Sequence, residues 1–157
     1  MRHILKIHRL LGDQIPAPQH SFTIELFNPE KHKQEWLDLN NQIFIDHPDQ
    51  GNWVMADLEN RMAEPWFDAT GFFLAIDGGQ IVGSCWSKIH HDHVNQGPVG
   101  ELYVIGVASH YGGRGVGLAV SISALNYFTA KGITEAMLYV DADNEKALKL
   151  YKSLGFN

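Results

Sequence analysis

The feature that most constrains this fold is the stretch of residues 100–118, GELYVIGVASHYGGRGVGL. Residues 101–107 form an apolar run of strand length, rich in β-branched and aromatic residues, which is typical of a strand buried on both faces. Four glycines then fall within residues 112–117, and a helical pattern begins at Val116. Glycines permit positive φ and leave room for backbone N–H groups to converge on an anion. Because a helix start adds unpaired N–H groups and the positive end of its dipole, the stretch predicts a pyrophosphate-binding turn.

Other interpretations compete for this glycine turn. A Walker loop needs a Lys-Ser/Thr pair after its glycines, and Gly117-Leu118-Ala119 does not supply one. A dinucleotide-binding turn needs its glycines in the order GxGxxG and an acidic residue at the end of the next strand, and the glycine order here is different. The local pattern alone leaves open a glycine turn that only joins a strand to a helix.

Composition narrows the class of protein. The chain has 157 residues, of which 45% are hydrophobic, and this is enough for one globular domain with a core. The net charge of −6 gives no basic footprint for nucleic acid, and no apolar run has the length of a membrane span. Cys85 is the only cysteine, which excludes an internal disulfide and favours a reducing compartment. Since the N-terminus also lacks the features of a signal peptide, we expect a cytoplasmic protein with no nucleic-acid or membrane partner.

The order of expected elements indicates a mixed α/β (α+β) domain with helices on both sides of a central mixed sheet. Asn28 and Pro29 are typical of a helix start, and Asn144 caps a last helix. Residues 21–157 form one predicted domain, whereas residues 1–20 are interpreted as an arm or an inter-repeat linker, in which the apolar residues before Pro16 could share one helical face. The expected strands are residues 22–27, 72–76, 80–89, 101–107 and 136–140, and the expected helices are residues 29–45, 55–62, 118–130 and a segment after Asn144.

Two motifs resemble those of the GNAT acetyltransferase family. The loop of residues 112–117, GGRGVG, resembles the family's Gln/Arg-x-x-Gly-x-Gly/Ala loop, and residues 144–156, NEKALKLYKSLGF, resemble its closing N-x-x-A-x-x-x-Y-x-x-x-G-F motif. The resemblance implies the GNAT acyl-CoA N-acyltransferase fold, with acetyl-CoA as co-substrate and its pyrophosphate on the glycine loop. Gly112 stands where the family usually has Gln or Arg, so one side-chain contact is absent while the backbone donors remain.

A narrower resemblance is to the mycothiol synthase family, whose members carry two tandem GNAT repeats. The similar segments include FIDHPDQG at residues 44–51, AEPWFD at 63–68, WSKIH at 86–90, GPVGELYVIGV at 97–107 and MLYVDADN at 137–144. They match the second, active repeat, and residues 9–20 resemble the linker between repeats. The resemblance implies acetyl transfer to the cysteinyl amine of desacetylmycothiol. Because the family continues with a further strand, we expect that strand and the first repeat to be missing, which would leave an open sheet edge for self-association.

The resemblance also assigns roles to individual residues. Glu101 matches the substrate-contacting glutamate and could accept the proton of the attacking amine, although a strand-end surface carboxylate stays an alternative. Tyr151 matches the general acid that protonates the departing thiolate, although a core tyrosine stays an alternative. Asp49, Lys88 and Tyr139, with Glu101, match positions that face the acceptor. The residues expected at acetyl-CoA are Ile105, Gly106, Val107, Gly112, Gly113, Arg114, Gly115, Val116, Gly117, Leu118, Asn144 and Lys149.

The histidines before the central strand raise the question of a metal. His90, His91 and His93 lie near Asp92 and could form a ligand set, but chance histidines in a polar loop are the favoured explanation, and we expect no metal. Three functions therefore stay open. They are a mycothiol-synthase-like N-acetyltransferase, a GNAT enzyme for another amine such as a peptide N-terminus or a small polyamine, and a module that binds acetyl-CoA without catalysis.

Overall fold

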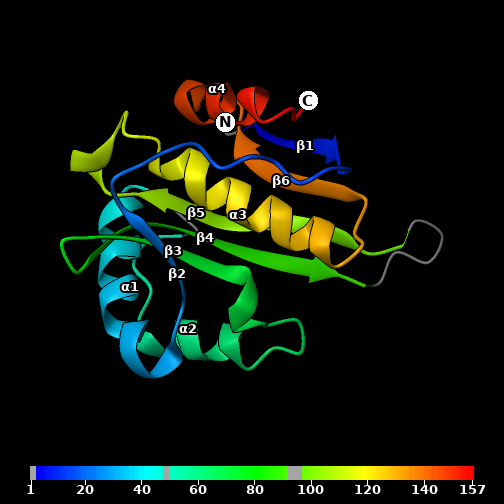
Figure 1. Ribbon diagram of the computed structural model, residues 1–157. Helices are drawn as coiled ribbons and strands as arrows, with labels where there is room; N and C mark the ends of the chain where they lie inside the picture. Colours follow the sequence, from blue (N-terminus) through cyan, green and yellow to red (C-terminus); the bar gives the residue numbers. More distant parts are fainter. Residues whose placement is uncertain (1–2, 48–49, 92–96) are drawn as a thin grey trace.

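The fold is built on one mixed sheet of six strands. The computed structural model describes residues 3–47, 50–91 and 97–157. The strands lie in the order β1-β6-β5-β4-β3-β2 (Figure 1). The β5–β6 pair is parallel, and the other four pairs are antiparallel. The strand bounds are β1 Ile4–Leu10, β2 Thr23–Leu26, β3 Phe72–Asp77, β4 Gln80–His90, β5 Val99–Val107 and β6 Glu135–Asp141.

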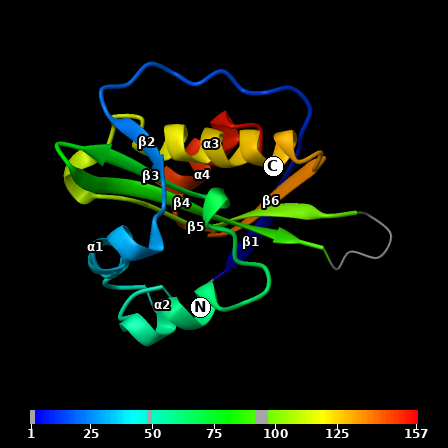
Figure 2. The same ribbon diagram turned by 60° about the horizontal axis from the view of Figure 1, so that its bottom comes forward.

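Four helices cover the two faces of this sheet. They are α1 Pro29–Ile43, α2 Met55–Met62, α3 Val116–Ala130 and α4 Glu145–Ser153. Both views place α1 and α2 on one face and α3 and α4 on the other (Figure 1, Figure 2). The predicted caps form, because Asn28 Oδ1 accepts from the Glu30 N–H at 3.0 Å and Asn144 Oδ1 accepts from the Ala147 N–H at 3.1 Å. Of the helices in the described ranges, none has the length and apolar character needed to span a bilayer.

Each face of the sheet has its own core. On the α3 side, Leu125 and Phe128 are fully buried against the sheet. On the α1 side the core is aromatic, and Trp86 on β4 stacks on Phe72 of β3 with ring centroids 4.7 Å apart. Trp36 of α1 meets Trp86 edge-on and donates its indole N–H to Ser84 Oγ at 2.9 Å. Trp36 and Trp86 are therefore packing residues of this core.

The N-terminal segment forms a strand, whereas its sequence pattern was also compatible with a helix that has one apolar face. From Ile4 to Leu10, β1 pairs along β6, so β6 lies inside the sheet and β1 forms its edge. A strand forms here because β1 satisfies the backbone groups of β6, and this tertiary pairing overrides the weak helical pattern. The segment that follows runs across α3 toward β2 at the opposite edge (Figure 1). Asn126 of α3 holds it, since its side chain exchanges hydrogen bonds of 2.7 and 2.9 Å with the backbone of Ile15.

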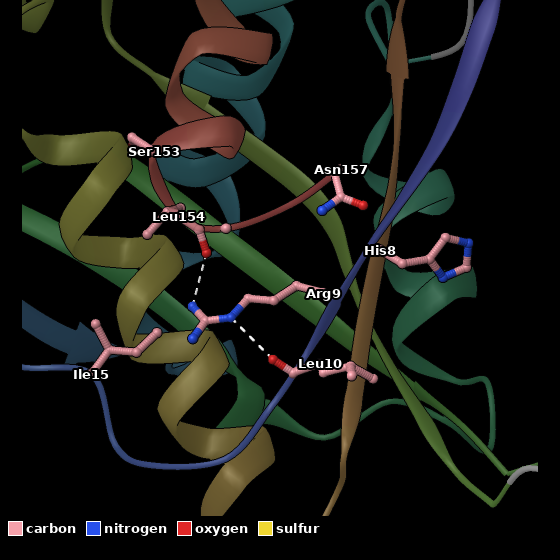
Figure 3. A pocket seen from close by; sticks show the side chains of 8 residues that line it. His8, Arg9, Leu10, Ile15, Ser153, Leu154 and Asn157 are labelled. Carbon is pink, nitrogen blue, oxygen red and sulfur yellow. Dashed lines mark hydrogen bonds between the residues drawn. The ribbon is translucent and has the colours of Figure 1, made fainter.

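The last described residue returns to β1. His8 and Asn157 exchange both backbone N–H···O bonds, each 3.0 Å long. Arg9 Nη1 donates to the Leu154 carbonyl at 2.8 Å, across a cavity of about 680 Å³ between β1 and the end of α4 (Figure 3). The last described residue therefore pairs with part of the outer edge of β1, at His8.

The buried core predicts a matched pair of stability effects. Phe128→Ala should lower the free energy of unfolding by about 3–5 kcal/mol, because it opens a cavity beneath α3. Leu10→Ala, at a side chain that is 79% exposed, should change it by less than about 0.5 kcal/mol. Urea unfolding followed by circular dichroism measures both values. Equal effects would contradict the placement of the core.

Candidate active site

The site begins where two parallel strands separate. β5 and β6 pair only at Gly100–Ala136 and Glu101–Met137, and no further pairing follows along these two described strands. Two cavities lie beside the diverging parts of the strands. One, of about 580 Å³, extends to the glycine loop, and a smaller one, of about 250 Å³, is lined by Tyr103 and Tyr139. Strand divergence therefore exposes backbone of β5 that a continuous ladder would have used.

The glycine loop presents a row of unused backbone donors. Gly113 and Gly115 have φ values of +78° and +80°, a region that favours glycine. The first backbone bond of α3 runs from the Ala119 N–H to the Gly115 carbonyl at 3.0 Å. Within the described part of the chain, no N–H from Gly112 to Leu118 donates to a backbone carbonyl. The loop and the first turn of α3 can therefore bind an anion with backbone groups, as the sequence predicts.

Two further glycines have close neighbours on α4. A Cβ on Gly117 would lie 3.1 Å from Leu150 Cδ2, so a side chain there would crowd α4. A Cβ on Gly112 would lie 3.1 Å from the Nζ of Lys146. The Lys146 ammonium thus stands beside the position where Gln or Arg is usual in the resembled family. It puts positive charge at the loop from another element.

Most of the predicted cofactor residues line the larger cavity. Arg114 does not line it, because its side chain is exposed and its guanidinium lies 4.8 Å from the centre of the Tyr111 ring. Lys149 is also exposed and lies outside the lining. The predicted residues that do line it are Ile105, Gly106, Val107, Gly112, Gly113, Gly115, Val116, Gly117, Leu118 and Asn144, together with Tyr151.

The sequence missed the wall that α1 contributes. Ile43 and Phe44, at the end of α1, line the larger cavity, and so does His47 in the loop that follows. Ile43 and Phe44 have the helical spacing of core residues, so the local sequence pattern did not indicate that they line a cavity. A Cβ on Gly106 would lie only 3.0 Å from Ile43 Cδ1, and this contact marks where α1 meets β5.

Tyr151 lies where the two cavities meet. It lines both of them, and it is only 7% exposed. Burial raises the pKa of the Tyr151 phenol, because the low dielectric disfavours the phenolate. Burial therefore keeps this phenol protonated at the junction.

Glu101 lies at the last paired position before the strands separate. Its Oε1 is 2.7 Å from His90 Nε2, and its side chain is 9% exposed. Lys88 is its register partner on β4, but the Lys88 Nζ lies 4.6 Å from the centre of the Trp66 ring and 5.5 Å from that of Tyr103. The structure thus brings Glu101 and Lys88 together on one face of the sheet, where the sequence places an acceptor.

The remaining predicted residues have different outcomes. Tyr139 lies on β6, two positions beyond the register partner of Glu101, and its 55% exposed side chain lines the smaller cavity. Asp49 lies outside the described residues, as do Asp92 and His93. Among the residues that are described, no group of three or more His, Cys, Asp or Glu side chains is arranged to hold a metal ion.

A sheet whose parallel strands separate beside a glycine loop and a helix start defines a domain of the GNAT fold, as the sequence predicts. The profile of the Acetyltransferase (GNAT) family matches residues 20–156, and the chain belongs to this family. Among solved structures it is similar to a GCN5-related N-acetyltransferase from Sphaerobacter thermophilus, with a TM-score of 0.78 and 23% identity over 99% of this chain and 48% of that one. It is also similar to the aminoglycoside N-acetyltransferase AAC(6')-Iy in complex with CoA, with a TM-score of 0.70 and 26% identity over 91% of this chain and 92% of that one.

Several relatives that are similar in sequence carry one name. The chain is 41% identical to a mycothiol acetyltransferase of Thermobispora bispora, over 99% of this chain and 54% of the relative. It is also 41% identical to a mycothiol acetyltransferase of Frankia alni, over 99% of this chain and 50% of the relative. These findings confirm the predicted resemblance, and the chain spans about half the length of these relatives.

The loop geometry predicts a binding defect that can be separated from a folding defect. Gly113 and Gly79 share nearly the same φ, +78° and +77°, and a Cβ on either would meet nothing within 4 Å. Gly113→Ala and Gly79→Ala should each cost about 1–2 kcal/mol of stability. Only Gly113→Ala should also lower the affinity for CoA, by about tenfold, because it turns the loop N–H groups. Calorimetric titration with CoA measures this, and equal affinities in the two variants would contradict an anion-binding role for the loop.

Proposed function

We propose that this chain is an acetyl-CoA-dependent N-acetyltransferase that acetylates the cysteinyl amine of desacetylmycothiol. The observation that carries the proposal is the row of unused N–H groups from Gly112 to Leu118, at a cavity that Tyr151 also lines. The names of the similar mycothiol acetyltransferases support the choice of acceptor. The structural similarity to an acetyltransferase in complex with CoA supports the choice of acetyl donor.

The donor side of the site fits acetyl-CoA. The loop N–H groups and the N-terminus of α3 would hold the pyrophosphate, and the nearby Lys146 adds a positive charge. The backbone of Ile105 and Val107 lies along the cavity in the part of β5 that no longer pairs with β6. These groups would bind the pantetheine arm and the acetyl carbonyl, where an N–H stabilises a developing oxyanion. Acetyl-CoA supplies the activated acyl group when bound.

The acceptor side offers a carboxylate, a cation and aromatic rings. Glu101 would accept a proton from the attacking amine, directly or through a water, because the amine must be neutral to attack. Lys88 would bind hydroxyl groups or the cysteinyl carbonyl of the acceptor, and Tyr139 would contact its sugar-inositol part. Asp49 is proposed to pair with the acceptor ammonium. A cation between Trp66 and Tyr103 favours an acceptor rich in hydroxyl groups over a polycation.

The reaction then needs a proton on the leaving sulfur. Collapse of the tetrahedral intermediate forms the amide bond and breaks the carbon–sulfur bond, and Tyr151 donates its phenolic proton to the departing thiolate. Its burial keeps that proton in place until the thiolate forms.

The test of this function is a product assay. Incubation with acetyl-CoA and desacetylmycothiol should yield one N-acetyl group per CoA released, as measured by mass spectrometry. Turnover of spermidine or of a peptide N-terminus in preference to desacetylmycothiol would contradict the choice of acceptor. Binding of acetyl-CoA with no turnover of any of these amines would contradict catalysis and leave a binding module.

Tyr151→Phe predicts a loss of turnover without a loss of binding. Removal of the general acid should lower kcat by about 10²–10⁴-fold while the CoA affinity is unchanged. Because the pKa of the Tyr151 phenol is raised, its deprotonation should cause no fall in kcat up to about pH 10, the ordinary value for tyrosine. Steady-state rates from about pH 6 to 10 test both statements. A variant with wild-type kcat would contradict the role of the phenol.

We also propose that two copies associate through the part of the outer edge of β1 that Asn157 leaves unpaired, and that the protein acts in the cytoplasm. Three of the exposed large apolar side chains, Ile4, Leu5 and Leu10, lie on this strand, and an exposed strand edge is a template for pairing. The buried free thiol of Cys85 supports a reducing compartment.

The association predicts a concentration-dependent mass. Sedimentation equilibrium should show a dimer for the wild-type chain and a monomer for Ile4→Lys, because a charge on this edge opposes pairing. Val54→Lys, at another exposed apolar residue away from the sheet edge, is the matched control and should leave the dimer intact. A monomer at every concentration of the wild-type chain would refute this association.

A further inference from the structure

We propose that His90 is a positioning residue that holds Glu101 in the orientation needed to accept a proton, and that it keeps Glu101 apart from Lys88. This inference rests on the proposed acetyl transfer, because it concerns the carboxylate at the acceptor side of that site. Its evidence is the diagonal pair formed by His90 on β4 and Glu101 on β5, whose side chains meet on one face of the sheet.

The hydrogen bond has a defined direction. A carboxylate only accepts hydrogen bonds, so the Nε2 of His90 must carry the hydrogen in the 2.7 Å contact with Glu101 Oε1. In the described part of the chain, His90 is the side chain that hydrogen-bonds to Glu101. A bond to an ionised group is stronger than a neutral one, and it fixes the carboxylate rotamer. The other oxygen, Oε2, is then the one left for the acceptor amine.

The position of Lys88 shows why such a bond is needed. Lys88 and Glu101 are direct cross-strand partners, and opposite charges at such positions ordinarily attract each other. A direct ion pair would occupy both the base and the cation of the acceptor site. Instead, the Lys88 ammonium lies over Trp66 and Tyr103, and the Tyr103 hydroxyl accepts a hydrogen bond of 3.2 Å from Arg61. His90 thus holds Glu101 and the two rings hold Lys88, so that the two charged groups do not form a direct ion pair.

The kinetic test compares His90→Phe with His90→Gln, since the Gln amide can donate from nearly the place of Nε2. His90→Phe should lower kcat with desacetylmycothiol by about 10- to 100-fold, the range for a lost hydrogen bond to a charged group. His90→Gln should restore kcat to within about threefold of wild type, and the affinity for acetyl-CoA should stay unchanged in both. His91→Phe, one position along at an exposed side chain, is the matched control and should leave kcat unchanged.

A double-mutant cycle separates positioning from a general packing effect. In a Glu101→Ala background, His90→Phe should lower the residual rate by less than about twofold, because the group that it positions is already absent. A full loss in that background would overturn the proposal, and so would failure of His90→Gln to restore the rate in a folded variant.

A spectroscopic readout does not depend on turnover. Nitrogen-15 spectra of the imidazole should show His90 with its hydrogen on Nε2 in the wild-type chain. In Glu101→Ala that hydrogen should exchange rapidly with water. If no amine is acetylated, the proposed function fails, but the spectra still show whether His90 donates a hydrogen bond to Glu101. A hydrogen found on Nδ1 alone in the wild-type chain would overturn the proposal.

Discussion

The structure depends on the separation of β5 from β6 after Glu101. Up to that residue the two strands satisfy each other's backbone groups, and beyond it the backbone of β5 is available to a ligand. An unpaired buried backbone group is costly, so this opening is stable only if other groups or a ligand use the freed donors and acceptors. The glycine loop that follows β5 and the first turn of α3 add more unpaired N–H groups at the same place. The larger and the smaller cavity therefore both lie beside one break in the ladder.

The two faces of the sheet contribute unequally to the site. The α3 face fixes the glycine loop, because α3 begins at the loop and is anchored by Leu125 and Phe128. The α1 face supplies the side-chain chemistry, since Glu101, Lys88 and His90 share that face with an aromatic core. Tyr151 reaches the junction from α4. The proposed site therefore combines a donor half made mostly of backbone with an acceptor half made of side chains.

The sequence predicted the sheet and helices well where the signals were local. The Asn28 and Asn144 caps, the apolar run of the central strand and the glycine turn each act within a few residues, and the structure shows each in place. The strand at Ile4–Leu10 could not be predicted in this way, because its only reason is the free edge of β6, more than a hundred residues away.

The residues of the candidate site also differ in whether a local sequence pattern predicts them. Residues that would bind a ligand through their backbone groups follow from the order of glycines, so Gly113 and Gly117 could be named from the sequence. The wall formed by Ile43 and the contact between His90 and Glu101 depend on how separate elements pack, and neither leaves a local pattern. His90 in particular read as one of several chance histidines in a loop, whereas it ends β4 and points to the neighbouring strand.

Thermal unfolding with added ligand tests most directly whether the break between β5 and β6 serves an acyl-CoA ligand. At about 100 times its dissociation constant, acetyl-CoA should add roughly 2.7 kcal/mol to the free energy of unfolding. CoA should stabilise to a similar degree, and ADP should stabilise less because it lacks the pantetheine arm that would lie along β5. A folded chain whose unfolding does not respond to acetyl-CoA would contradict the account.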